Sequence, residues 1–257
     1  MKRWLFVAVC MCGLGIVNCG DSDSPTKPTD PTDELRELIA QTPRADEEAE
    51  MAALWMCGEL VAPESTYVQV REGLKIVRRQ YGQAIPKLRE IKFTHPWSMR
   101  YFLPILTTDG AANYRAGRHF EIDSLTELLN GEIIDTIAQS FDNSFQVNIQ
   151  FAGRLYLDSV DVMYSRDPNV DWINHYWIGY DTPNVYPWRL EDGRLTLLFR
   201  EAWGDCAVGC IYSRFWYFRV DGDSIEYVGE FYLDGINPWP DWWDEAKAGY
   251  EEYRGWD

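Results

Sequence analysis

Histidine and basic residues are scarce in this chain, and the charge is strongly of one sign. The 257 residues include three His, and 24 Lys and Arg stand against 41 Asp and Glu, a net charge of −17 at pH 7. Such a charge repels the phosphate backbone of nucleic acids, so we expect no nucleic-acid partner. It also repels anionic bilayers, so membrane attachment needs a hydrophobic or covalent anchor.

Sequence motifs of the common catalytic and metal sites are also absent. The chain has no phosphate-binding loop, nucleophile elbow, HExxH helix or complete calcium loop. None of His95, His119 and His175 stands at ligand spacing from another. Hydrophobic residues make up 46% of the chain, a proportion typical of a globular protein. We therefore expect a folded protein with no catalytic residue, no metal ligand and no cofactor.

The one long hydrophobic run lies near the N-terminus and predicts a processing segment. After two basic residues, residues 4–17 are largely apolar, which is too short to span a membrane and typical of a signal peptide. Residues 16–19 (Ile-Val-Asn-Cys) resemble the lipobox of bacterial lipoproteins, although Asn18 stands where that family usually has Gly, Ala or Ser. The resemblance implies a signal peptide at 1–18 and attachment of palmitate or a similar fatty acid to Cys19. Ordinary secretion with cleavage elsewhere is the alternative.

A polar, proline-rich stretch follows this cysteine. Residues 20–33 (GDSDSPTKPTDPTD) contain no large apolar side chain, so we expect residues 19–33 to form a lipidated cysteine and a disordered tether. By resemblance to lipoprotein sorting rules, Gly20 directly after Cys19 implies the outer membrane. The expected location is the bacterial cell envelope, with the membrane as a partner through the lipid anchor.

Two later cysteines predict a local disulfide bond. Cys206 and Cys210 lie in the sequence GDCAVGCI, between two strand-like runs, and a disulfide across a tight turn suits an extracytoplasmic protein. A redox centre of the thioredoxin type has two intervening residues rather than three, and the chain has no second cysteine pair for zinc. A redox or metal role for this pair remains the alternative. Cys57 is interpreted as a small buried apolar residue.

Residues 34–85 are predicted to be helical. We expect a short helix capped by Asp33, a second at 46–56, and a third that begins at Pro63 and ends at Gly82. Apolar residues of the third helix recur at spacings of three and four, which predicts one buried face: Tyr67, Val70, Leu74, Val77 and Tyr81.

Residues 86–184 combine both types of pattern. Strands are expected at 91–93, 99–107, 145–151 and 170–180, and helices at 122–130 and 155–164. This order predicts a ferredoxin-like α+β unit. Residues 88–184 also resemble subtilisin-propeptide-like domains.

Residues 185–234 are predicted to form antiparallel β-hairpins. The run IYSRFWYFRV (211–220) is aromatic on both faces and indicates a central strand, and residues 221–224 indicate a hairpin turn before strands at 225–228 and 231–233. A Trp-rich acidic tail occupies 235–257. The predicted fold is thus α+β, with N-terminal helices, a ferredoxin-like middle unit and C-terminal antiparallel hairpins.

The sequence AWGDCAVGCIYSRFWYF (202–218) resembles a motif of extracytoplasmic bacterial lipoproteins. Residues 53–82 resemble the same group. The resemblance supports a common origin with that group, but it implies no particular activity.

Aromatic residues, at 15%, are more abundant than a core alone requires. Trp239, Trp242 and Trp243, beside Asp241 and Asp244, form a combination typical of a sugar or peptide site. Alternatively, these Trp residues seal the β-sheet. We place any ligand site between the Cys206–Cys210 turn and this tail, with Trp203 and Asp205 contributing from the turn.

These patterns favour a binding or structural module of the cell envelope whose partner is a glycan or an envelope protein. A secreted hydrolase acting on polysaccharide or peptide is the first alternative, because carboxylates and Trp are abundant. A protease-inhibitor-like protein is the second, implied by the propeptide resemblance alone.

Overall fold

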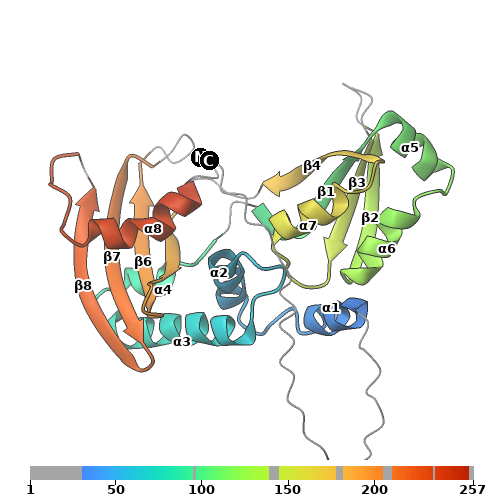
Figure 1. Cartoon of the computed structure of the whole chain (residues 1–257). Helices are drawn as coiled ribbons and strands as arrows, with labels where there is room; N and C mark the ends of the chain where they lie inside the picture. Colours follow the sequence, from blue (N-terminus) through green and yellow to red (C-terminus); the bar gives the residue numbers. More distant parts are fainter. Residues whose placement is uncertain are drawn as a thin grey trace, which may run out of the picture.

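The computed structural model describes residues 31–94, 97–138, 145–177, 182–204, 210–233 and 235–254. Two four-stranded antiparallel sheets lie at opposite ends of the molecule, with α2 between them (Figure 1). The predicted α+β class is therefore confirmed. The predicted signal segment, Cys19 and most of the tether lie outside the described residues.

In the described part of the chain, four helices precede the first strand. They are α1 (Pro31–Ile39), α2 (Glu47–Cys57), α3 (Glu64–Tyr81) and α4 (Lys87–Glu90). The Asp46 side chain caps α2 by accepting a hydrogen bond from the backbone N–H of Ala49 (3.1 Å). The expectation that Asp33 caps the first helix is wrong, because α1 begins at Pro31 and Asp33 lies within its first turn.

The predicted apolar face of α3 is confirmed. Its inner positions are buried, and Tyr81 at its end is half-buried and packs on the same core: Tyr67, Val70, Leu74 and Val77. This face lies against the second sheet. A Cβ added to Gly73 would lie 2.6 Å from Cδ2 of Leu195, so a larger residue here would force the Leu195 side chain to shift.

The first sheet has the strand order β2-β3-β1-β4, and all neighbours are antiparallel. Its strands are β1 (Trp97–Leu106), β2 (Gly131–Ala138), β3 (Phe145–Phe151) and β4 (Val170–Trp177). Helices α5 (Thr108–Arg115) and α6 (Phe120–Leu128) connect β1 to β2, and α7 (Leu157–Tyr164) connects β3 to β4. The alternating apolar residues of β3 are buried in a core with α6 and α7, as predicted.

Two features of this region differ from the expectations. Residues 91–93 do not form a strand, because side chains satisfy their backbone: Phe93 N–H donates to Glu48 (2.9 Å), and the Ile91 carbonyl accepts from Arg78 (2.7 Å). Strand β2 is not predicted by the sequence pattern, since a bulge between Ile133 and Asp135 interrupts its alternation and most of the strand is exposed.

The second sheet consists of C-terminal hairpins, as predicted. Its strands follow each other in chain order: β5 (Asn184–Arg189), β6 (Leu195–Trp203), β7 (Tyr212–Asp221) and β8 (Ser224–Leu233). β7 is internal, and Asp221 pairs with Ser224 across a two-residue turn in which Gly222 has φ +53°. The strands expected at 225–228 and 231–233 are one strand with a register shift. The final helix, α8 (Trp243–Arg254), follows β8.

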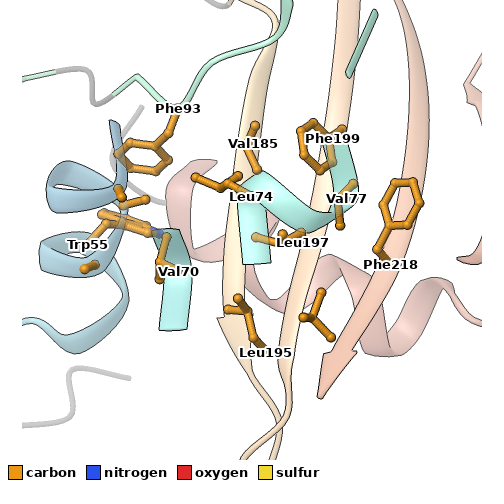
Figure 2. Close-up of a cluster of buried hydrophobic side chains, with 14 of the residues drawn as sticks. Trp55, Val70, Leu74, Val77, Phe93, Val185, Leu195, Leu197, Phe199 and Phe218 are labelled. Carbon is orange, nitrogen blue, oxygen red and sulfur yellow. The ribbon is translucent and has the colours of Figure 1, made fainter. Parts of the chain in front are cut away.

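Each face of the second sheet has its own core. On the α3 face, Leu74 and Val77 of α3 lie beside Leu197 and Phe199 of the sheet, and Trp55 of α2 lies beside Val70 in the same buried cluster (Figure 2). On the α8 face, helix α8 covers a second cluster: Tyr186, Leu198, Phe215, Tyr217, Phe231, Trp243 and Ala246. Burying one large apolar side chain contributes about 1.5–3 kcal/mol, so both layers stabilise the sheet.

Buried acidic residues of α2 connect the two sheets. Glu48 forms a two-bond ion pair with Arg78 of α3 (2.6 and 2.8 Å), while Glu50 pairs with Arg154 (3.3 Å), which follows β3 of the first sheet. Burial raises the pKa of Glu50. Burial also opposes ionisation of Glu48, but Arg78, the Phe93 N–H and Lys92 together outweigh it and lower the pKa of that carboxyl.

Candidate functional site

Three Trp residues of the predicted site are brought together where the chain passes from β8 into α8. Trp239 stacks on Trp243 (ring centroids 4.7 Å apart) and contacts Phe231 of β8 (5.0 Å). Trp243 is buried, whereas 54% of Trp239 is exposed. Pro238 and Pro240 flank Trp239 and restrict its backbone, and the contacts with Trp243 and Phe231 limit the positions open to its ring.

Trp242 seals the sheet. Its ring stacks on Tyr217 (5.4 Å) and lies over Gly229 of β8, where an added Cβ would be 2.7 Å from Nε1 of the indole. Trp242 and Trp243 therefore fill the space between α8 and the sheet, which is the sealing role. Only Trp239 of the three projects largely into solvent.

A hollow of about 640 Å³ opens beside Trp239. Its walls combine two indoles with charged groups: Trp239, Pro240, Asp241, Trp243, Asp244, Lys247 and Glu251. Lys247 Nζ lies 2.9 Å from Asp244 and 3.7 Å from Glu251, and the hydrogen bond to Asp244 raises the pKa of Lys247. Within the described residues, Asp241 is exposed and forms no ion pair. Aromatic faces beside hydrogen-bond acceptors suit a polyhydroxylated ligand.

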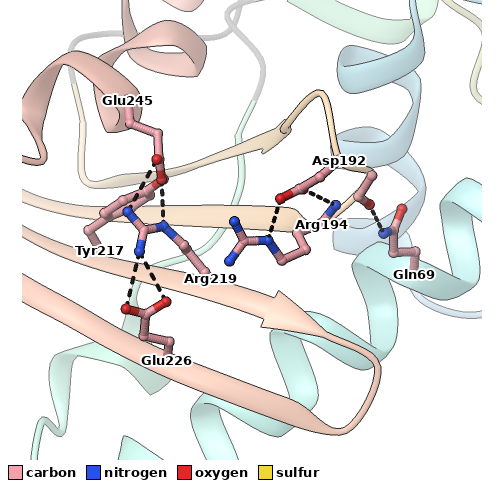
Figure 3. Close-up of polar contacts among 8 residues, drawn as sticks. Gln69, Asp192, Arg194, Tyr217, Arg219, Glu226 and Glu245 are labelled. Carbon is pink, nitrogen blue, oxygen red and sulfur yellow. Dashed lines mark hydrogen bonds and ion pairs between the residues drawn. The ribbon is translucent and has the colours of Figure 1, made fainter.

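A partly buried polar network connects α8, which carries part of the hollow, to the sheet (Figure 3). Glu245 accepts hydrogen bonds from Tyr217 (2.5 Å) and from Arg219 (2.6 and 3.1 Å), while Arg219 also donates to Glu226 (3.0 and 3.1 Å). Burial, followed by the bond to Glu245, raises the pKa of Tyr217. Burial disfavours the Glu245 carboxylate, but Arg219 and Tyr217 outweigh it and lower its pKa. The helix that carries the acids is therefore fixed in position.

Trp203 is not brought together with the three Trp residues of the tail. Its ring centroid lies 6.0 Å from that of Tyr212 and 5.6 Å from that of Tyr232. Along β7 and β8 these two tyrosines alternate with the residues of the α8 face, so they belong to the α3 face. The sheet thus separates Trp203 from Trp239. Asp205 and Cys206 lie outside the described residues.

The end of the turn that the structure does describe is disulfide-bonded at Cys210, and Cys57 is free. Gly204 has φ +102°, and a Cβ added there would lie 3.1 Å from Cβ of Ile211, so the two ends of the turn approach closely. The pairing of Cys210 with Cys206 stays a prediction. Burial raises the pKa of the Cys57 thiol.

Exposed hydrophobic side chains gather at this end of the second sheet, where β6 and β8 end and β7 begins. They are Ile211, Tyr212, Tyr232, Ile236 and Trp239. Ile236 is 86% exposed and lies three residues before Trp239. Tyr212 and Tyr232 lie on the α3 face of the sheet, whereas Trp239 packs against Phe231 on the α8 face, so these side chains do not form one continuous surface.

Lys247 and Glu251 of the hollow are not found by reasoning from sequence. A signal for them exists, since Asp244, Lys247 and Glu251 are spaced by three and four residues, as on one face of a helix. The prolines and tryptophans just before them obscure this pattern. Within the described residues, no group of three or more His, Cys, Asp or Glu is placed to hold a metal ion.

Comparison with known proteins adds no relative: no family model, curated protein or solved structure matches the chain. None of the helices in the described ranges is both long and apolar enough to cross a membrane.

Proposed function

We propose that this protein is a lipid-anchored component of the bacterial cell envelope whose C-terminal sheet binds a carbohydrate at Trp239. The lipobox resemblance at Cys19 supports attachment to the outer membrane, and the polar residues after it supply a tether. Of the two expected partners, a glycan fits best an exposed indole that lies beside carboxylates.

The main support for the proposal is the position of Trp239. One side of its ring rests on Trp243, and its exposed part forms a wall of the 640 Å³ hollow. An indole held in place loses little conformational entropy when a sugar ring stacks on it. Asp241, Asp244 and Glu251 supply acceptors for hydroxyl groups at the same hollow.

We further propose that the first sheet and its helices form a ferredoxin-like unit. The strand order β2-β3-β1-β4, with helices between β1 and β2 and between β3 and β4, supports this assignment. We propose that this unit is a scaffold, connected through the ion pairs of α2 to the second sheet, which carries the binding site.

Binding to arrays of envelope polysaccharides tests the glycan proposal. We expect Trp239→Ala to weaken binding by at least tenfold, because a central aromatic contact of this kind contributes about 2 kcal/mol. The matched control is Trp172→Ala, which removes another half-exposed Trp (50%) from β4 in the first sheet.

The melting temperature should be nearly unchanged in Trp239→Ala, since much of that side chain is in solvent. Equal retention of the wild type and both variants on every polysaccharide would contradict the proposal, and so would retention of none of them. Binding to an envelope protein alone would assign the hollow to a protein partner.

A further inference from the structure

The charges around the hollow are unbalanced. Its walls carry three carboxylates, Asp241, Asp244 and Glu251, but a single ammonium group, Lys247. Lys247 is already paired with Asp244 (2.9 Å) and lies 3.7 Å from Glu251. One negative charge, that of Asp241, is left without an ion-pair partner in the described part of the chain.

The unpaired carboxylate lies close in sequence to the exposed indole. Asp241 follows Trp239 by two residues, and both line the same hollow. Trp243 stacks on one face of Trp239 and 54% of Trp239 is still exposed, so we place the ligand on the opposite face. The face of an indole attracts cations, and most strongly when a carboxylate lies nearby to share the charge.

We infer that the hollow selects a polysaccharide whose sugars carry free amino groups; this inference rests on the proposed carbohydrate site. The sugar ring stacks on Trp239 while its ammonium group pairs with Asp241. Polysaccharides rich in carboxylate or phosphate are disfavoured, because they meet the excess negative charge of the hollow and the −17 charge of the whole chain.

The test compares two β-1,4-linked oligosaccharides of equal length, one of glucosamine and one of N-acetylglucosamine. Titration calorimetry with the full mature chain at about pH 5 keeps the amine of the sugar protonated. We expect the glucosamine oligomer to bind at least tenfold more tightly, and added salt to reduce this preference.

Two variants separate the contribution of the Asp241 charge from that of stacking on Trp239. Asp241→Asn should abolish the preference for the amine while the N-acetylated oligomer binds as before, whereas Trp239→Ala should weaken binding of both. Asp109→Asn, which removes an acidic residue from the first turn of α5, is the matched control and should leave the preference unchanged.

The outcomes distinguish this inference from the proposal on which it rests. Equal affinity for the two oligomers, or a preference that survives Asp241→Asn, would overturn the amine selectivity and leave a carbohydrate site. Failure of both oligomers and of every arrayed polysaccharide to bind would overturn the proposed function itself. Tighter binding of oligolysine with the same number of amines would assign the site to a basic peptide and overturn the inference.

Discussion

At the scale of single residues, glycine and tryptophan determine how the tail meets the sheet. Trp242 lies flat on Tyr217 because β8 has no side chain at Gly229. Trp239, only three residues earlier, contacts Trp243 and Phe231 but is 54% exposed. Residues of one type, close together in sequence, therefore have different roles.

Gly229→Ala tests the contact at Trp242. An added Cβ would lie 2.7 Å from Nε1 of the stacked indole, so we expect the free energy of unfolding to fall by about 1–3 kcal/mol. Urea denaturation measures the change. In a Trp242→Ala background the same substitution should be neutral or slightly stabilising, because the clash is gone and alanine restricts the unfolded chain. An equal loss in both backgrounds would show that the strand, rather than the indole, rejects the methyl group.

At the scale of elements, the acidic start of α2 has two functions. Glu47, Glu48 and Glu50 favour the N-terminal end of the helix dipole, as the sequence predicts. Two of them also form buried ion pairs with distant segments, Glu48 with Arg78 and Glu50 with Arg154. Partners 30 and 104 residues away are decided by the fold, because helix propensity acts only over neighbouring turns.

Glu48→Gln tests this arrangement. It leaves the buried Arg78 guanidinium without a counter-charge, so we expect unfolding at pH 7 to require about 3 kcal/mol less free energy than in the wild type. Glu90→Gln, which removes an exposed partner of Lys87, is the control and should change stability by less than about 1 kcal/mol.

The effect of Glu48→Gln should depend on pH. The pKa of Glu48 in the folded protein lies below its ordinary value of 4.5, so its contribution is present above that value and is lost as the pH falls through the lowered pKa. The difference between wild type and variant should therefore narrow between pH 7 and pH 3. A difference that stays constant over this range would mean that packing, rather than charge, accounts for the loss.

At the scale of the whole molecule, the proposed lipid anchor and the proposed binding site lie at opposite ends of the sequence. The anchor is predicted at Cys19, and the hollow lies within residues 239–251. The tether predicted by the polar residues before α1 would hold both sheets away from the membrane.

Metabolic labelling with palmitate tests the anchor. The wild type should incorporate the label and fractionate with membranes, whereas Cys19→Ala should do neither. Cys57→Ala is the matched control, since it removes a free cysteine from α2 and should leave the labelling intact. Labelling that persists in Cys19→Ala would contradict lipidation at this position.

The sequence by itself determined the local structure whose causes are local. The start of α2 near Asp46, the end of α3 near Gly82 and the turn at Gly222 all depend on residues within a few positions of each other. From the sequence the candidate site was placed between the Cys206–Cys210 turn and the tail, since Trp residues and acids gather in the tail. Only the tertiary structure decided which Trp is exposed and that Trp203 lies across the sheet, because burial and strand pairing depend on partners far away in the chain. Strand β2 was not predicted, because a bulge interrupts its alternation. The strand expected at 91–93 was wrong, because side chains of α2 and α3 bind the backbone there.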